Sequence, residues 1–544
     1  MKYAKYFAIA LASLATVGCT GDFEDINKNP NSIEVGGMAP YNLIEPLLID
    51  GANTLMSHMY EYNNEISQIT AAINSNVDDK HRYVLADAQF IVPFREYYRR
   101  AMDAKHICDL AARQGDPNWR AIGLTMKVFY LSKVADLYGS IAYTEALRGS
   151  EGVLRPRIES QQEAYLHMME ELEEANSYYN LSQTLTGRDK DAMYNGDIAK
   201  WKKFTNSLHL RILMRVSGRN NDFTPSVGER IAAIVNNPAT YPVFESDADA
   251  AAVKYSAADV GHRSQFNPQS YTNQEDFSSN HKLSEQLISM TVDSATGEPF
   301  DPRLYVWGKT RQADDWKWRG AASGCSSGYG NDLRQYCTYL HYETLVNETN
   351  PNYLMDYAEL LFIKAEAALK GWIAGGAEQY YNAALTASCQ KWSVYGANGA
   401  FPEKGAVSIS SADIDAFLAD PRVAYSAANA ERLIAEQKWL SLFWIAGFEQ
   451  YSEMRRTGYP AVAIGSGAIA YNRTNGKFPA RFAYPTIALA NNYNNYMSAI
   501  DEMGGNGEES NNMILPLWYS GQAVAADKGT PWPHSFRTLT TDNR

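Results

Sequence analysis

Helical periodicity is the feature that most constrains the fold of this 544-residue chain. Apolar side chains recur three or four positions apart in 118–138, 160–179 and 198–217, a spacing that places them on one face of an α-helix. The stripe of the first segment is formed by Trp119, Ile122, Met126, Phe129, Tyr130, Val134 and Leu137. Asp116 and Pro117 supply a start signal for this helix, and Gly139 supplies a stop. These segments predict a core of packed helices.

A second helical block is predicted from residue 354 onward. Segments 354–371 and 377–391 form a predicted helix pair, in which Ala377, Tyr381 and Ala384 have the spacing of a tetratricopeptide second helix. One long helix is expected over 429–451. The remaining stretches are rich in Gly, Asn, Pro and aromatic residues and predict long loops, which are often functional; they are 220–345, 393–428 and 456–535. No linker interrupts the chain, so we expect one all-α scaffold of tetratricopeptide-like helix pairs with long aromatic-rich loops.

The N-terminus has the pattern of an exported protein. Lys2 and Lys5 precede an apolar run at 7–17 that is too short to cross a bilayer, which takes about 20 residues, and is typical of a signal peptide. The run ends in Thr16-Val17-Gly18-Cys19, which resembles a bacterial lipobox with Thr16 in place of the usual Leu. The alternative is an ordinary signal peptide with a chance cysteine. We predict a signal peptide at 1–18, a lipidated tether at 19–40 that carries lipid on Cys19, and a single domain at 41–544.

The charge balance argues against a nucleic-acid partner. The chain has 49 Lys and Arg against 62 Asp and Glu, for a formal net charge of -13. A surface of this sign repels phosphate backbones unless a local basic patch exists. The richest basic spots are only Tyr98-Arg99-Arg100 and Arg455-Arg456. We therefore expect no nucleic-acid binding.

Catalytic and metal motifs are weakly supported. Gly324-Cys325-Ser326-Ser327-Gly328 fits the G-x-S-x-G pattern of hydrolases, but the charged stretch before it is not the buried strand that this motif needs. The nine histidines show no zinc-binding spacing. Residues 293–297 lack the alternating acids of a calcium loop. We expect no catalytic residue, no metal and no cofactor, although a glycosidase acid pair stays open because its separation is a three-dimensional property.

An aromatic loop is the most suggestive chemical feature. Its rings stand among Asp, Lys, Arg and Gly, where burial of all of them is not expected; they are Trp307, Trp316, Trp318, Tyr329, Tyr336 and Tyr339. Exposed rings in an ordered loop are platforms for sugar faces or peptide side chains. Cys325 and Cys337 bracket the Gly-rich part of the loop, and both a disulfide and two thiols are open there. Cys108 and Cys389 stand on helical patterns and are expected to be buried thiols.

Short motifs follow one another over nearly the whole chain. The first, Phe23-Glu24-Asp25-Ile26-Asn27-Lys28-Asn29-Pro30-Asn31, comes soon after Cys19. Later ones include Asp136-Leu137-Tyr138-Gly139-Ser140-Ile141-Ala142-Tyr143, Tyr194-Asn195-Gly196-Asp197, Asp301-Pro302-Arg303-Leu304, Gln437-Lys438-Trp439, Glu453-Met454-Arg455-Arg456-Thr457-Gly458-Tyr459-Pro460 and Pro479-Ala480-Arg481-Phe482-Ala483-Tyr484-Pro485. In this order they resemble the SusD/RagB-type nutrient-binding lipoproteins of Bacteroidetes, and specifically the SusD-like branch. Ser140 and Ala142 depart from the family pattern.

The resemblance implies a tetratricopeptide-like helical protein held by outer-membrane lipid at the cell surface. It would capture an oligosaccharide and hand it to a SusC-like TonB-dependent transporter; the same role for peptides is the first alternative, and a secreted hydrolase is a more distant one. The aromatic loop and a polar break between helical stretches at 74–87 supply the candidate ligand-binding residues, and the resemblance suggests that these two loops approach each other. These residues are Trp316, Trp318, Tyr329, Tyr83, His81 and Arg82.

Overall fold

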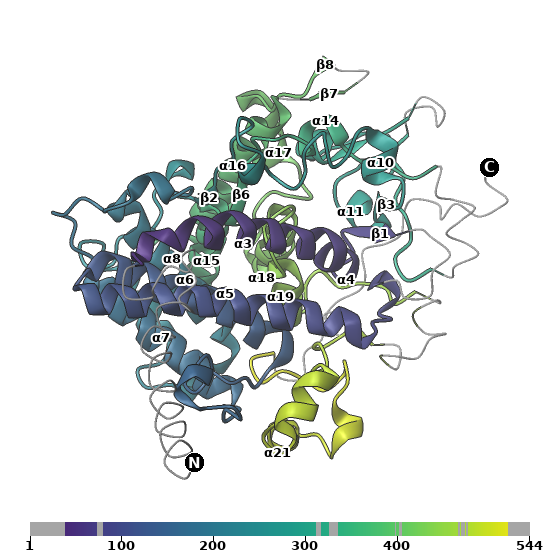
Figure 1. Cartoon of the computed structure of the whole chain (residues 1–544). Coiled ribbons are helices and arrows are strands. Elements are labelled where there is room, and N and C mark those ends of the chain that lie inside the picture. Colours follow the sequence, from purple (N-terminus) through teal and green to yellow (C-terminus); the bar gives the residue numbers. More distant parts are fainter. Residues whose placement is uncertain are drawn as a thin grey trace, which may run out of the picture.

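The structure is a computed structural model in which two blocks of helices form the body of the protein (Figure 1). It describes residues 38–72, 80–311, 317–325, 336–397, 399–401, 405–465, 468, 474 and 477–520. The predicted mainly helical scaffold is confirmed. No helix within these ranges is both long enough and apolar enough to span a bilayer.

The first block is built around two long neighbouring helices that a two-residue turn connects. Its helices are α3 (Ile44–His58), α4 (Asn64–Ile66), α5 (Asp87–Gln114), α6 (Pro117–Tyr138), α7 (Gln161–Tyr178), α8 (Ile198–Arg215) and α9 (Val227–Val235). The Asp116 carboxylate caps α6 by accepting hydrogen bonds from the Asn118 and Trp119 backbone N–H groups, both at 3.1 Å. Three predicted helices are therefore confirmed to within a few residues.

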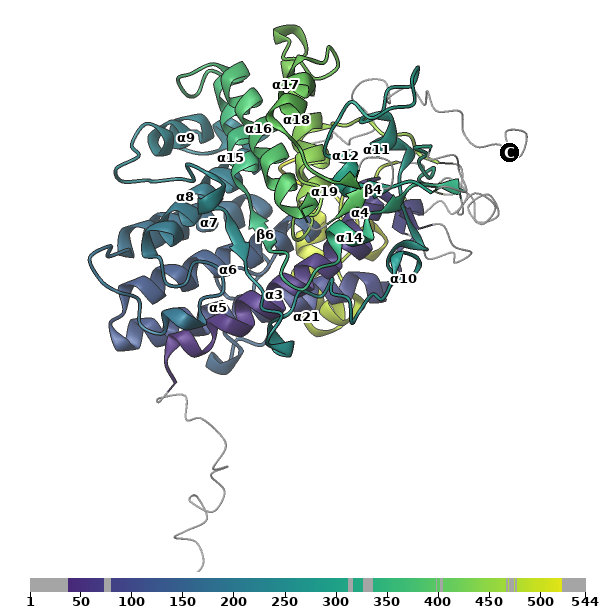
Figure 2. The same cartoon turned by 90° about the horizontal axis from the view of Figure 1, so that it is seen from above.

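The second block lies against the first, with α15 beside α8 (Figure 2). It contains α15 (Tyr357–Leu369), α16 (Ala377–Gly396), α17 (Ser411–Ala419), α18 (Ala430–Ser441) and α19 (Glu449–Thr457). The predicted pair at 354–371 and 377–391 corresponds to α15 and α16, which pack closely together.

The single long helix predicted over 429–451 is wrong. The chain leaves the helix after Ser441, turns through 442–448 and starts α19 at Glu449. Trp444 and Gly447 take positive φ angles of 64° and 98° within this turn. Leu442, Phe443, Trp444, Ile445 and Ala446 are all at most 2% exposed. Because the turn is itself buried, its apolar residues continue the pattern of a helix and hide the break.

Stretches that were expected to be loops contain further short elements. Besides α9 and α17, which also fall in these stretches, the helices there are α10 (Gln274–Ser278), α11 (Glu285–Ser289), α12 (Leu304–Trp307), α14 (Tyr342–Leu345) and the longer α21 (Thr486–Glu502). Two small antiparallel pairs join β2 (Ala251–Val253) to β6 (Asn352–Met355) and β7 (Ala400–Phe401) to β8 (Gly405–Ala406). The Asn-rich sequence of α21 lacks a regular apolar stripe, and the other elements are too short for periodicity to show.

Candidate ligand-capture surface

A four-stranded sheet lies on the side of the molecule away from α7 (Figure 1). Its strands stand in the order β1 (Thr70–Ala72), β3 (His281–Leu283), β5 (Tyr339–Leu340) and β4 (Gly308–Lys309), and all neighbours are antiparallel. Strands β4 and β5 lie at the two ends of the aromatic loop found in the sequence. The sheet therefore brings the start and end of that loop together and places them near β1.

His81 and Arg82 lie in the short helix η4 (Lys80–Arg82), and both are fully buried. The Gly324 backbone N–H donates to Nδ1 of His81 at 2.9 Å, and Nε of Arg82 donates to the Cys325 carbonyl oxygen at 2.6 Å. The two loops that the resemblance suggested would approach each other are therefore in contact. His81 and Arg82 hold the aromatic loop in place through its backbone.

Gly324 is the closest point of this junction. Its φ angle is +70°, and a Cβ atom there would lie 2.9 Å from the Gly465 backbone nitrogen. A larger residue would strain the backbone and collide with the segment around Gly465. Glycine is thus required where the chain segments at 81, 324 and 465 meet.

Tyr83 is a support for this junction. Its ring is buried, its hydroxyl accepts a hydrogen bond from Nε2 of Gln68 at 2.9 Å, and Phe478 packs edge-on at 5.7 Å between centroids. Burial raises the pKa of the Tyr83 hydroxyl well above its ordinary value. Both Tyr83 and Gln68 take positive φ angles, which are uncommon for residues other than glycine.

Glu65 ties β1 to β3 from beneath the sheet. Its buried carboxylate accepts from the Thr70 hydroxyl at 2.9 Å and from the Ala72 backbone N–H at 2.8 Å, and it lies 3.1 Å from Nδ1 of His281. Burial alone would raise the pKa of Glu65, but the His281 hydrogen bond and the nearby histidine charges outweigh it and lower the value to about 2. The group is ionised at neutral pH and fixes the edge of the sheet.

Polar groups that the sequence reasoning missed lie around Tyr339 at the other end of the sheet. The Tyr339 hydroxyl donates to Glu275 at 2.7 Å and accepts from Arg311 at 2.5 Å. The side chains of Glu275 and Arg311 remain 62% and 35% exposed. Arg311 immediately precedes residues 312–316 of the aromatic loop, which lie outside the described ranges. Its position next to the aromatic loop is the one feature of the sequence that could have pointed to Arg311. Within the described ranges, no group of three or more His, Cys, Asp or Glu side chains could hold a metal ion.

Comparison with known families identifies the fold. The family model described as "Starch-binding associating with outer membrane" matches residues 30–485, which is most of the chain. The chain belongs to the SusD-like family. It is therefore a SusD-like nutrient-binding protein, of a family associated with the outer membrane.

Solved structures share the fold of this SusD-like protein. A SusD homolog from Bacteroides fragilis is 24% identical with a TM-score of 0.73, and the match covers 89% of this chain and 100% of that one. A chitin-binding protein is 24% identical with a TM-score of 0.70, over 89% and 99% of the chains. A SusD homolog from Bacteroides uniformis is 19% identical with a TM-score of 0.68, also over 89% and 99%. A search of curated proteins finds no match.

The sequence does not lead us to expect burial of all six rings of the aromatic loop, and the structure buries three of them. Trp307, Trp318 and Tyr339 are buried. Trp318 stacks on Phe401 with 5.6 Å between centroids and 10° between planes, and meets Tyr305 edge-on at 5.6 Å. In an extended segment, successive side chains point to opposite sides. The charged neighbours of Trp318 therefore stay outside while its ring enters the core of this SusD-like protein.

Several predicted residues lie outside the described ranges. Trp316, Tyr329 and Cys19 belong to this group, so their ligand-binding and lipid-bearing roles stay predictions. Cys325 and Cys337 are both buried at the two ends of an undescribed segment. Among the described residues the structure records no bond between their sulfur atoms, and the possible disulfide stays a prediction.

Proposed function

We propose that this SusD-like protein is a lipid-anchored surface protein that captures an oligosaccharide and hands it to a SusC-like TonB-dependent transporter. Membership of a family described as starch-binding at the outer membrane supports this role more than any other observation. The cysteine that ends the apolar N-terminal run supports the anchor. A tether would keep the binder at high effective concentration beside its channel.

The capture surface of this proposal is the undescribed part of the aromatic loop, with Trp316 and Tyr329 as its stacking rings. The junction of His81 and Arg82 with Gly324 and Cys325 supports this choice, because it holds the stretch of the loop between these two rings on the scaffold. Tyr83 and Trp318 would act from below as supports, since both rings are buried. Arg311 and Glu275 would supply hydrogen bonds at the opposite end of the sheet.

Binding measurements on loop variants test this surface. Calorimetry with maltoheptaose, chitohexaose and a mixed peptide library would be run on the wild type and on Trp316→Ala/Tyr329→Ala. Loss of two stacked anchors should weaken binding of the accepted ligand by roughly a hundredfold. Tyr493→Ala is the matched control, because this tyrosine is 49% exposed on α21. A double variant that keeps wild-type affinity would contradict the proposed surface.

The same samples separate the alternatives. Binding of peptides but of neither glycan would transfer the proposed role to peptide uptake. Release of new reducing ends during incubation with either glycan would identify a hydrolase instead. Trp318→Ala, measured beside the loop variant, should lower the melting temperature, since it removes a buried ring.

A further inference from the structure

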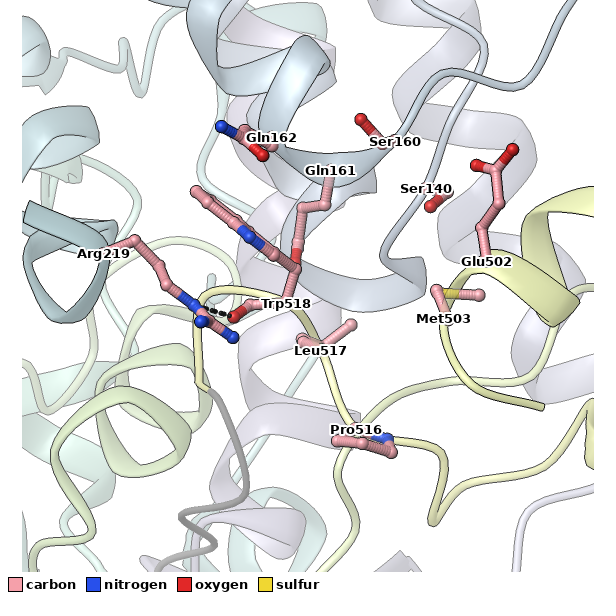
Figure 3. A pocket seen from close by; sticks show the side chains of 10 residues that line it. All are labelled: Ser140, Ser160, Gln161, Gln162, Arg219, Glu502, Met503, Pro516, Leu517 and Trp518. Carbon is pink, nitrogen blue, oxygen red and sulfur yellow. Dashed lines mark hydrogen bonds between the residues drawn. The ribbon is translucent and has the colours of Figure 1, made fainter. Parts of the chain in front are cut away.

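A separate hollow of about 310 Å³ opens between the start of α7, the end of α21 and the segment around Trp518 (Figure 3). Figure 3 shows Trp518 and Arg219 on one side of it and Glu502 and Met503 on the other. None of its lining residues belongs to η4, to 317–325 or to the four-stranded sheet. It is therefore distinct from the capture surface proposed above.

The indole of Trp518 forms a prearranged wall of this hollow. Nε of Arg219 donates to the Trp518 carbonyl oxygen at 2.8 Å, and its guanidinium lies 5.5 Å from the indole centroid. Phe223 meets the indole edge-on at 5.9 Å. The buried side chain of Gln161 fixes the next residue, because its oxygen accepts from the Tyr519 backbone N–H at 3.3 Å. The ring remains half-buried, so that part of its surface is open.

An apolar floor completes the wall. Met503 and Leu517 pack over Gly139, which ends α6 with a φ angle of +90°. A Cβ atom on Gly139 would lie 2.7 Å from Sδ of Met503 and 3.1 Å from Cδ2 of Leu517. The glycine therefore allows these two side chains to line the base of the hollow.

Polar groups of both hydrogen-bonding types surround the apolar part. The carboxylate of Glu502 is exposed, and no hydrogen bond or ion pair to another described residue is recorded for it. The side-chain nitrogen of Gln162 donates to the Asp222 carbonyl oxygen at 3.0 Å, which leaves the side-chain amide oxygen of Gln162 to accept a hydrogen bond from a ligand. Nε of Arg219 donates to the Trp518 carbonyl oxygen, and the terminal nitrogens of this lining residue are further donors. Acceptors and donors are thus both present, and the two charges are opposite.

This combination fits a small neutral sugar. One face of a pyranose ring is apolar C–H surface that packs on an indole, while its hydroxyls both donate and accept hydrogen bonds. A single acid and a single base disfavour a ligand with net charge of either sign. The volume is at the low end of small-molecule pockets, which span about 300–1,000 Å³. We propose that this hollow is a second sugar-binding site for a neutral mono- or disaccharide unit; the proposal deepens the proposed glycan-binding function and rests on it.

Maltose and N,N′-diacetylchitobiose are the probes, and ligand-observed NMR titration is the measurement. Trp518→Ala should weaken binding of the accepted probe roughly tenfold or more, and Glu502→Ala should weaken it less. Glu509→Ala is the matched control, since it removes another exposed acid from the short helix η13 (Glu508–Ser510) that follows α21. Thermal unfolding of each variant would confirm that it is folded, and Glu502→Ala keeps the test valid if Trp518→Ala unfolds.

The loop variant Trp316→Ala/Tyr329→Ala distinguishes this proposal from the proposed function. We expect it to keep binding the disaccharide in the hollow while it loses the longer glycan. If both hollow variants bind the probes like the wild type, the second site is refuted and the proposed function stands. If no glycan or disaccharide binds the wild-type protein, both proposals are refuted.

Discussion

His58 and His209 are buried and uncharged in the helical core. Nδ1 of His58 lies 2.8 Å from the Tyr97 hydroxyl. Burial lowers the pKa of His58 from 6.5 to about 3, and burial together with the charge of Arg230 lowers the pKa of His209 to about 3. In the unfolded chain both rings regain a pKa near 6.5. In mild acid the unfolded chain therefore binds two protons, one on each histidine, that the folded protein does not bind.

This difference predicts a loss of stability as pH falls. Between pH 6.5 and about 3 the unfolded chain binds more protons, so the free energy of unfolding decreases as pH decreases, by about 1.4 kcal/mol per pH unit for each histidine. Urea unfolding at pH 7, 6 and 5 measures the slope. His58→Gln should flatten it by one proton's contribution, and an unchanged slope in this variant would show that His58 is not the group responsible.

The cysteines make a second prediction at the residue scale. Burial raises the pKa of Cys108 and of Cys389 to about 12, so both stay protonated and react slowly in the folded state. We expect alkylation of these two only after unfolding. We also expect Cys325 and Cys337 to be recovered as a linked peptide from protein purified without reductant. Mass-spectrometric mapping decides, and alkylation of both loop cysteines without prior reduction would reject the disulfide.

At the scale of elements, a buried ion network joins α6, α8 and α19. The Glu449 carboxylate on α19 forms ion pairs with Lys133 on α6 and with Arg211 and Arg215 on α8. Burial by itself would raise the pKa of Glu449, but these three cations lower it far below its ordinary value. The network connects the second helical block to the first at the start of α19, directly after the buried turn at 442–448.

Removing this carboxylate should destabilise the protein strongly. Glu449→Gln removes the carboxylate that pairs with the buried Lys133, while Arg211 and Arg215 keep Glu359 and Glu453, and breaking such a buried pair costs about 3–5 kcal/mol. Urea unfolding at pH 7 measures the loss. Glu298→Gln is the control, because Glu298 is an exposed acid whose neutralisation should change stability by less than about 0.5 kcal/mol. Equal effects of the two substitutions would contradict a structural role for the network.

At the scale of the whole molecule, the anchor determines where the protein works. Cys19→Ala should abolish lipidation and release the protein from the outer membrane, since the only predicted attachment is the acyl chains on this residue. Labelled palmitate incorporation and membrane fractionation check this in the native host. Equal incorporation into the variant would show that lipid is not carried by Cys19. Glycan binding by the released protein should be unchanged, because none of the proposed ligand-contacting residues belongs to the predicted tether at 19–40.

Sequence alone determined the family and the helices that have a regular apolar stripe. The stripes of α6, α7 and α8 are visible because a helix repeats every 3.6 residues, and the cap at Asp116 acts on the first turn of its own helix. The family motifs are likewise local strings of residues. Stripes, caps and motifs can be recognised in the sequence without any information on contacts between distant residues.

Only the tertiary structure decided the rest, because burial depends on residues far away in the chain. The break at 442–448 is buried against Leu55 and Tyr353, so its apolar sequence resembles a helix. Trp318 enters the core because Phe401 and Tyr305 surround it, although its neighbours in sequence are charged. The strands of the four-stranded sheet are two or three residues long, too short for an alternation of period two to be read. The pairing of β1 with β3, and the contact of His81 with Gly324, follow from packing between segments more than 200 residues apart.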